Sequence, residues 1–98
     1  MVVAEGKIMM LKPEIIRVLQ REKAVCEAAL VRLQEKTHPL EKRFGWSTDT
    51  FLKLFNAGKV GDDQDFFRWY ALAEAIKEWQ TTYDSLEDLL TNKELVSA

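Results

Sequence analysis

Apolar and polar residues alternate with a helical period from Lys12 to Phe44. Apolar side chains recur there at steps of three and four residues, and seven of the nine positions on this line are apolar. Such spacing places them on one face of an α-helix, close to the seam of a coiled coil. The pattern therefore predicts one long helix, with Lys23 and Thr37 as the polar exceptions. The line consists of Ile16, Leu19, Lys23, Cys26, Leu30, Leu33, Thr37, Leu40 and Phe44.

Two prolines bear on this helix. Pro13 fits the first turn, where its missing N–H costs nothing. Pro39 removes the hydrogen bond to the carbonyl of Glu35 and disfavours helical backbone at His38. Because the apolar line continues beyond Pro39, we expect either a kinked helix or two collinear pieces that meet near His38.

A short helix and a second long helix follow. Ser47 is a good N-cap, and Gly58 a good C-terminal stop, for a helix of about ten residues. Apolar residues then step again by three and four as far as about Leu90, which predicts a long third helix. Its line consists of Phe66, Trp69, Ala73, Ile76, Trp79, Tyr83, Leu86 and Leu90.

These elements predict an all-α fold, a long helical hairpin made of a long kinked helix, a short connecting helix and a long return helix. We expect one helical domain over residues 12–90, an extended or disordered N-terminal arm over 1–11 and a frayed tail over 91–98. A slender hairpin leaves apolar flanks, and covering them is favourable at roughly 25 cal/mol per Å². We therefore expect a homodimer that forms a bundle, or a complex with another protein. The flanking residues are Ile15, Val18, Val25, Ala29, Leu52, Leu72 and Leu89.

Charge divides the chain into a basic first part and an acidic second part. Through Val60 there are 11 Lys and Arg against 7 Asp and Glu, and from Gly61 onward there are 3 against 9. The two parts either complement each other within the fold or leave the acidic part for a basic partner. The basic residues are not clustered with aromatic residues, so direct binding of nucleic acid is not expected.

The cysteine content and the lack of targeting or membrane segments in the sequence indicate the cellular compartment. Its single cysteine, Cys26, allows no internal disulfide, which suits a reducing environment. The N-terminal stretch is interrupted by Glu5 and Lys7 and does not have the pattern of a signal peptide. No stretch reaches the roughly 18 apolar residues of a membrane helix. We expect a cytoplasmic protein that does not bind membranes.

The stretch VGDDQDFFRWYAL, residues 60–72, joins three acids to four aromatic rings. Asp62 or Asp63 can cap the third helix, and acids in a first turn favour its dipole. A calcium loop is the weaker alternative, because the later ligands of such a loop are missing. The rings either fill the core or bind a partner. The candidate partner-binding residues are Phe66, Phe67, Trp69 and Tyr70, with Ile8, Met9 and Met10 of the arm.

Catalytic patterns are weak. His38 is the only histidine, and no nucleophile stands near it in the sequence. Glu74 and Glu78 share a helix face, as the carboxylates of magnesium-dependent, all-helical nucleotide pyrophosphohydrolases do. No matching acidic pair stands on the seam of the first helix. We therefore expect no enzyme and no cofactor or metal, and keep the hydrolase as a lesser alternative.

Residues 38–79 resemble a group of small prokaryotic helical proteins. The matching segments are Phe44-Gly45-Trp46-Ser47 through Phe51, and Gly61-Asp62-Asp63 through Trp69. Trp46 and Arg68 depart from the Met and Glu that are commoner in that group. The resemblance implies an antitoxin-like protein of a toxin–antitoxin locus, with a basic toxin as its partner.

The function expected from the sequence is thus a non-catalytic protein-binding module, and in particular the antitoxin of a toxin–antitoxin pair. The first alternative is a structural or accessory helical oligomer without a toxin partner. The acidic, aromatic-rich third helix and the apolar arm are the features that favour binding.

Overall fold

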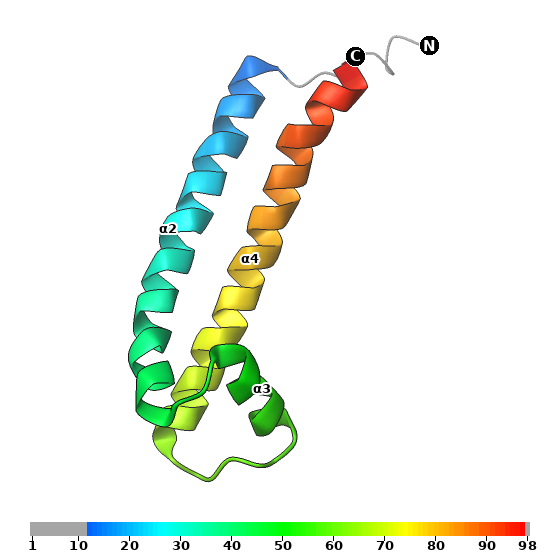
Figure 1. The fold of residues 1–98 in the computed structure, drawn as a ribbon. Helices are drawn as coiled ribbons and strands as arrows, with labels where there is room; N and C mark the ends of the chain where they lie inside the picture. Colours follow the sequence, from blue (N-terminus) through cyan, green and yellow to red (C-terminus); the bar gives the residue numbers. More distant parts are fainter. Residues whose placement is uncertain (1–11, 98) are drawn as a thin grey trace.

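A computed structural model describes the backbone of residues 12–97 and the side chains of residues 12–91. It contains three helices: α2 (Pro13–Phe44), α3 (Thr48–Asn56) and α4 (Gln64–Ser97). The two long helices lie side by side and run in opposite directions, and α3 sits beside α4 at the closed end of the hairpin (Figure 1). The predicted all-α hairpin is confirmed, and no strand is present between residues 12 and 97.

α2 begins and ends where its sequence predicts. Pro13 occupies the first turn, and Gly45 stops the helix in the left-handed conformation at φ 74°, its N–H donating to the carbonyl of Glu41. Only glycine adopts this backbone at little cost. The helix passes through Pro39 as one continuous element. The alternative prediction, that two separate helices meet near His38, is therefore wrong.

The predicted boundaries of α3 are also confirmed. The hydroxyl of Ser47 accepts a hydrogen bond from the N–H of Thr50 at 3.1 Å. At the other end Gly58 has φ 70°, its N–H donates to Phe55, and the N–H of Lys59 donates to the carbonyl of Leu54. This pair of bonds is the Schellman motif, which satisfies the last carbonyls of a helix.

The acidic run begins α4, as expected. The carboxylate of Asp63 accepts from the N–H of Asp65 at 2.9 Å, and its main-chain carbonyl accepts from Phe66 at 3.0 Å. Asp63 is thus the cap, and Asp65 lies in the first turn. The helix continues past the predicted end near Leu90 to Ser97. Residues 91–97, predicted as a frayed tail, therefore belong to the helix.

The core is concentrated at the closed end, where the three helices meet. Phe51 of α3 and Trp69 of α4 are fully buried and stack with ring centroids 4.1 Å apart and an interplanar angle of 1°. Phe66 of α4 and Leu40 of α2 complete the buried cluster. We call these four residues the aromatic cluster. Phe44, the last residue of α2, and Trp46, in the connection to α3, pack against it.

Further along the hairpin the seam is more polar. Thr37 is buried and donates its hydroxyl to the carbonyl of Gln34 at 3.1 Å, so its polarity is satisfied within α2. Lys23 forms an ion pair with Glu87 of α4, and its ammonium lies 5.4 Å from the ring centre of Tyr83. The hydrogen bond to Glu87 raises the pKa of Lys23 above its usual 10.5. Both polar exceptions on the apolar line thus have partners.

Replacing Phe51 by Ala is expected to destabilise the protein by about 3–5 kcal/mol, because it empties a fully buried site against Trp69. Phe67→Ala is the matched control, since Phe67 is 56% exposed, and its effect should stay within about 0.5 kcal/mol. Urea unfolding followed by circular dichroism measures the unfolding free energy of both variants. Equal losses would show that the aromatic cluster does not hold the closed end together.

Candidate functional site

The four rings singled out by the sequence divide into two groups. Phe66 and Trp69 are buried in the aromatic cluster, so the structure gives them a core role. Tyr70 is half-buried and stacks on Phe55 at 4.5 Å, while Phe67 meets the same ring edge-on and stays 56% exposed. Of the four rings, Phe67 is therefore the one that is exposed to solvent. The remaining candidates, Ile8, Met9 and Met10, lie outside the described residues.

A strip of apolar side chains runs along one side of the hairpin. On α4 its first three residues are spaced by seven, and residues seven apart lie on nearly one line of a helix. The fourth, Leu89, follows three residues after the last of them. On α2 it follows steps of three, seven and four, interrupted by Glu22. Five of the seven large, exposed apolar residues of the described chain belong to it. We call this set the side strip: Ile15, Val18, Val25 and Ala29 of α2, and Leu72, Trp79, Leu86 and Leu89 of α4.

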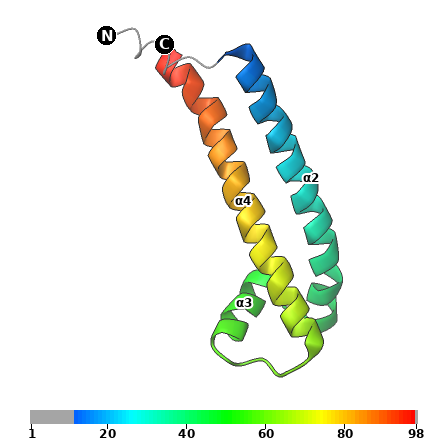
Figure 2. The same ribbon diagram turned by 180° about the vertical axis from the view of Figure 1, so that it is seen from behind.

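The two halves of the side strip lie on the same side of the hairpin. Arg43, on the α2 line of Ala29, forms an ion pair with Asp65, on the α4 line of Leu72. A groove lined in part by Lys36, Arg43 and Leu72 joins the same two lines. α3 contacts the opposite side, where Thr48 bonds to Glu41. Figure 2, in which α3 lies behind α4, looks onto the hairpin from the side without α3.

A second row on α4 contains two acidic residues. Phe67, Glu74, Thr81 and Asp88 are spaced by seven, and we call them the acidic row. Phe67, Thr81 and Asp88 are exposed, and Glu74 is half-buried beside Lys77, with which it pairs at 3.1 Å. Among the described residues, Asp88 has no cationic partner within ion-pair distance. This row faces away from the side strip, because it is offset from Leu72 and Trp79 by two residues, or about 200°.

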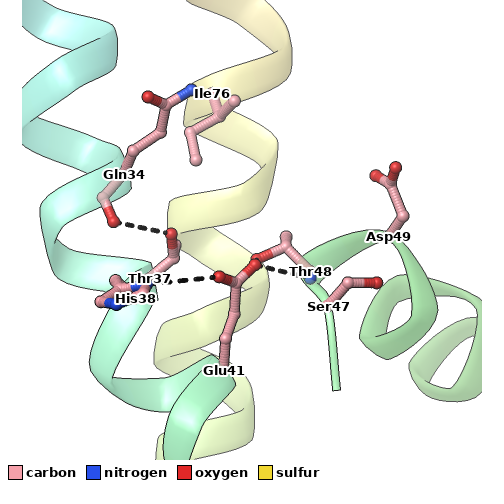
Figure 3. Close-up of a pocket in the computed structure, with 8 residues that line it drawn as sticks. All are labelled: Gln34, Thr37, His38, Glu41, Ser47, Thr48, Asp49 and Ile76. Atoms are coloured by element: carbon pink, nitrogen blue, oxygen red, sulfur yellow. Dashed lines mark hydrogen bonds and ion pairs between the residues drawn. The ribbon is translucent and has the colours of Figure 1, made fainter. Parts of the chain in front are cut away.

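A polar pocket of about 410 Å³ lies where α2 meets the start of α3 (Figure 3). One carboxylate oxygen of Glu41 accepts from both the N–H and the hydroxyl of Thr48, at 2.9 and 2.8 Å. The hydroxyl of Thr48 in turn accepts from the indole N–H of Trp69 at 3.0 Å. The lining residues are Gln34, Thr37, His38, Glu41, Ser47, Thr48, Asp49 and Ile76.

The bonds in this pocket are structural ones. Ser47 uses its hydroxyl to cap α3 and to donate to Thr50, so it is not set up as a nucleophile for His38. His38 is exposed and lies 3.9 Å from the other oxygen of Glu41. The hydrogen bonds from Thr48 to Glu41 hold the start of α3 against α2. The hydrogen bond from Trp69 to Thr48 links α4 to the same point. The arrangement positions the aromatic cluster and resembles no catalytic pair.

The two carboxylates that suggested a magnesium-dependent hydrolase, Glu74 and Glu78, differ in their surroundings. Glu74 pairs with Lys77, whereas Glu78 is exposed on the surface of α4. Within residues 12–91 no group of three or more His, Cys, Asp or Glu side chains is arranged to hold a metal ion. None of the described helices is long and apolar enough to cross a membrane.

A scan against protein-family models finds no match, and neither do searches of curated proteins and of solved structures. The class that the fold itself defines is an all-α helical hairpin with an exposed apolar side.

Sequence reasoning missed the bonds among Glu41, Thr48 and Trp69. Thr48 follows the N-cap of α3, a position at which a threonine has no special meaning. Glu41 and Trp69 are 7 and 21 residues away. No local pattern connects the three. In contrast, six of the eight residues of the side strip were predicted as flanks from their place beside the main seams. The other two, Trp79 and Leu86, were predicted on the main apolar line of the third helix, and Trp79 is exposed instead.

Replacing Thr48 by Val is expected to destabilise the protein by about 1–3 kcal/mol, because the indole N–H of buried Trp69 loses its acceptor. Thr82→Val is a fitting control, since the hydroxyl of exposed Thr82 bonds only within its own helix, to the carbonyl of Glu78. Thermal unfolding would measure both. If Thr48→Val is as harmless as the control, the attachment of α3 does not run through this hydroxyl.

Proposed function

We propose that this chain is a non-catalytic protein-binding module that works in the cytoplasm as a homodimer and holds a basic protein partner. The observation that carries the proposal is the gathering of exposed apolar residues into the side strip. Single exposed apolar residues are ordinary, whereas a contiguous patch marks an interaction site. Here most of the exposed large apolar side chains share one side of a hairpin.

The shape of the molecule supports association. The hairpin measures 60 × 24 × 17 Å and has a radius of gyration of 19.0 Å, against about 13 Å for a compact chain of 100 residues. Its accessible surface is 7117 Å², whereas a compact monomer of its mass exposes about 5,800 Å². Such a slender fold has too little interior to bury its apolar flanks alone.

The acidic row supports a basic partner. α4 carries seven Asp and Glu against three Lys and Arg over Gln64–Ser97, and Phe67 adds an exposed ring at one end of the row. Aromatic residues often anchor interfaces, and surrounding charges speed the encounter of opposite partners. An antitoxin that binds a basic toxin is the particular form of this function that we propose.

A helical oligomer without a toxin partner is the second candidate. It is favoured by the same side strip and needs no role for the acidic row. The nucleotide hydrolase has less support, because Glu74, one of its two candidate carboxylates, is engaged in an ion pair with Lys77.

Reversing the charges of the acidic row tests the basic partner. The tagged chain is used to capture proteins from a lysate of its host, and any retained protein of high isoelectric point is purified and rebound. The variant Glu74→Lys/Asp88→Lys should weaken that binding by on the order of 100-fold, by loss of attraction and gain of repulsion. Lys53→Glu/Lys59→Glu, at the exposed end of α3, is the matched control.

Two outcomes would count against this function. One is that no basic protein is retained by the wild-type chain. The other is that Lys53→Glu/Lys59→Glu strengthens binding about as much as Glu74→Lys/Asp88→Lys weakens it, because the contact would then follow the net charge of the chain and not the acidic row.

A further inference from the structure

We propose that two copies of this chain pair through their side strips with their closed ends together, so that α2 of each copy packs against α4 of the other. The result is a four-helix bundle with a two-fold axis parallel to the helices. The inference deepens the proposed homodimer by naming its surface and its orientation. It makes no use of the acidic row, which stays free on the outside.

Helix directions leave two simple ways to join the side strips symmetrically. A two-fold axis parallel to the helices sets α2 against α4 of the second copy. An axis across the helices sets α2 against α2 and α4 against α4, with the closed ends at opposite ends of the bundle. All neighbouring helices are antiparallel in both cases, so direction alone does not choose between them.

The net charges of the helices favour the arrangement in which α2 packs against α4 of the second copy. α2 carries seven Lys and Arg against five Asp and Glu over Pro13–Phe44, and α4 carries three against seven over Gln64–Ser97. Pairing α2 with α4 therefore joins opposite net charges, whereas pairing α4 with α4 joins two acidic helices. Like charges set against each other across an interface oppose association.

The register is fixed by contacts within the chain. Lys23 meets Glu87, and Glu27 meets Tyr83, so the residue numbers of pairs at the same height add to 110. An axis parallel to the helices leaves every height unchanged. The same rule then relates α2 of one copy to α4 of the other, and no sliding of one hairpin along the other is needed.

Applied to the side strip, this rule brings apolar residues together. Val25 falls within one residue of the height of Leu86 in the second copy, and Trp79 falls between the heights of Ala29 and Arg32. The small side chain of Ala29 leaves room for the indole ring. The two strips thus cover one another in the half of the hairpin remote from the aromatic cluster, where the chain's own core is thinnest.

The rule also brings unpaired charges together. Arg32 falls at the height of Glu78, and both side chains are exposed. Neither has an ion-pair partner among the described residues. Glu22 interrupts the side strip, and its charge is unfavourable inside an apolar interface. Its long side chain can place the carboxylate at the solvent-exposed rim of the interface.

The interface is tested by sedimentation equilibrium of the full chain over a range of concentrations. Val25→Glu and Trp79→Glu should each raise the dimer dissociation constant by on the order of 100-fold, because each buries an unpaired charge. Val31→Glu is the matched control: Val31 is a 55%-exposed valine of the same helix, outside the side strip. Glu22→Leu should tighten the dimer.

The orientation is tested by exchanging charges. Arg32→Glu and Glu78→Arg should each weaken the dimer by on the order of tenfold, and the double variant should restore it. In the crosswise arrangement these residues do not meet, so the double variant would be no better than the single ones. Circular dichroism and the unfolding free energy of each variant separate a lost interface from a lost fold.

A monomeric wild-type chain, or a dimer weakened equally by Val31→Glu and Val25→Glu, would overturn the inferred surface. A dimer that the charge exchange fails to restore would overturn the orientation. Neither result depends on capture of a basic protein, which Glu74→Lys/Asp88→Lys probes through the acidic row. Failure of the dimer and failure of the proposed partner are therefore distinguishable.

Discussion

The stacking of Phe51 on Trp69 is the contact on which the rest of this structure depends. It ties the short helix to the return helix at a fully buried position, and Leu40 closes the site from the first long helix. The remainder of the hairpin has fewer buried residues, with Cys26 and Leu30 as its apolar centre and an ion pair between Lys23 and Glu87 further out. The closed end thus fixes the geometry, and the long helices extend from it.

Local signals carried most of the fold prediction. Ser47, Gly45, Gly58 and Asp63 each act on backbone groups within a few residues, so their roles can be derived without knowing the tertiary structure. The spacing of the apolar lines likewise gave the two seams. Pro39 was harder, because packing on both sides of a proline can carry a helix through it.

The candidate sites depended on contacts between distant segments. The apolar line already placed Phe66 and Trp69 on the seam, and both are buried. The partial burial of Tyr70 could not be predicted, because it comes from stacking on Phe55 of α3. The attachment of Thr48 to Trp69 is hidden for the same reason. The flanks were easier, since a residue beside a known seam is exposed in any hairpin unless another chain covers it.

Cys26 offers a natural reporter of how this hairpin moves. Its thiol is 2% exposed and lies on the seam well away from the aromatic cluster. An alkylating reagent can reach the sulfur only when the two long helices separate there, so its reaction rate follows the frequency of that local opening. Any protein that covers the flanks would slow the modification without touching the sulfur, so a single native atom can report whether the neighbouring flank is occupied.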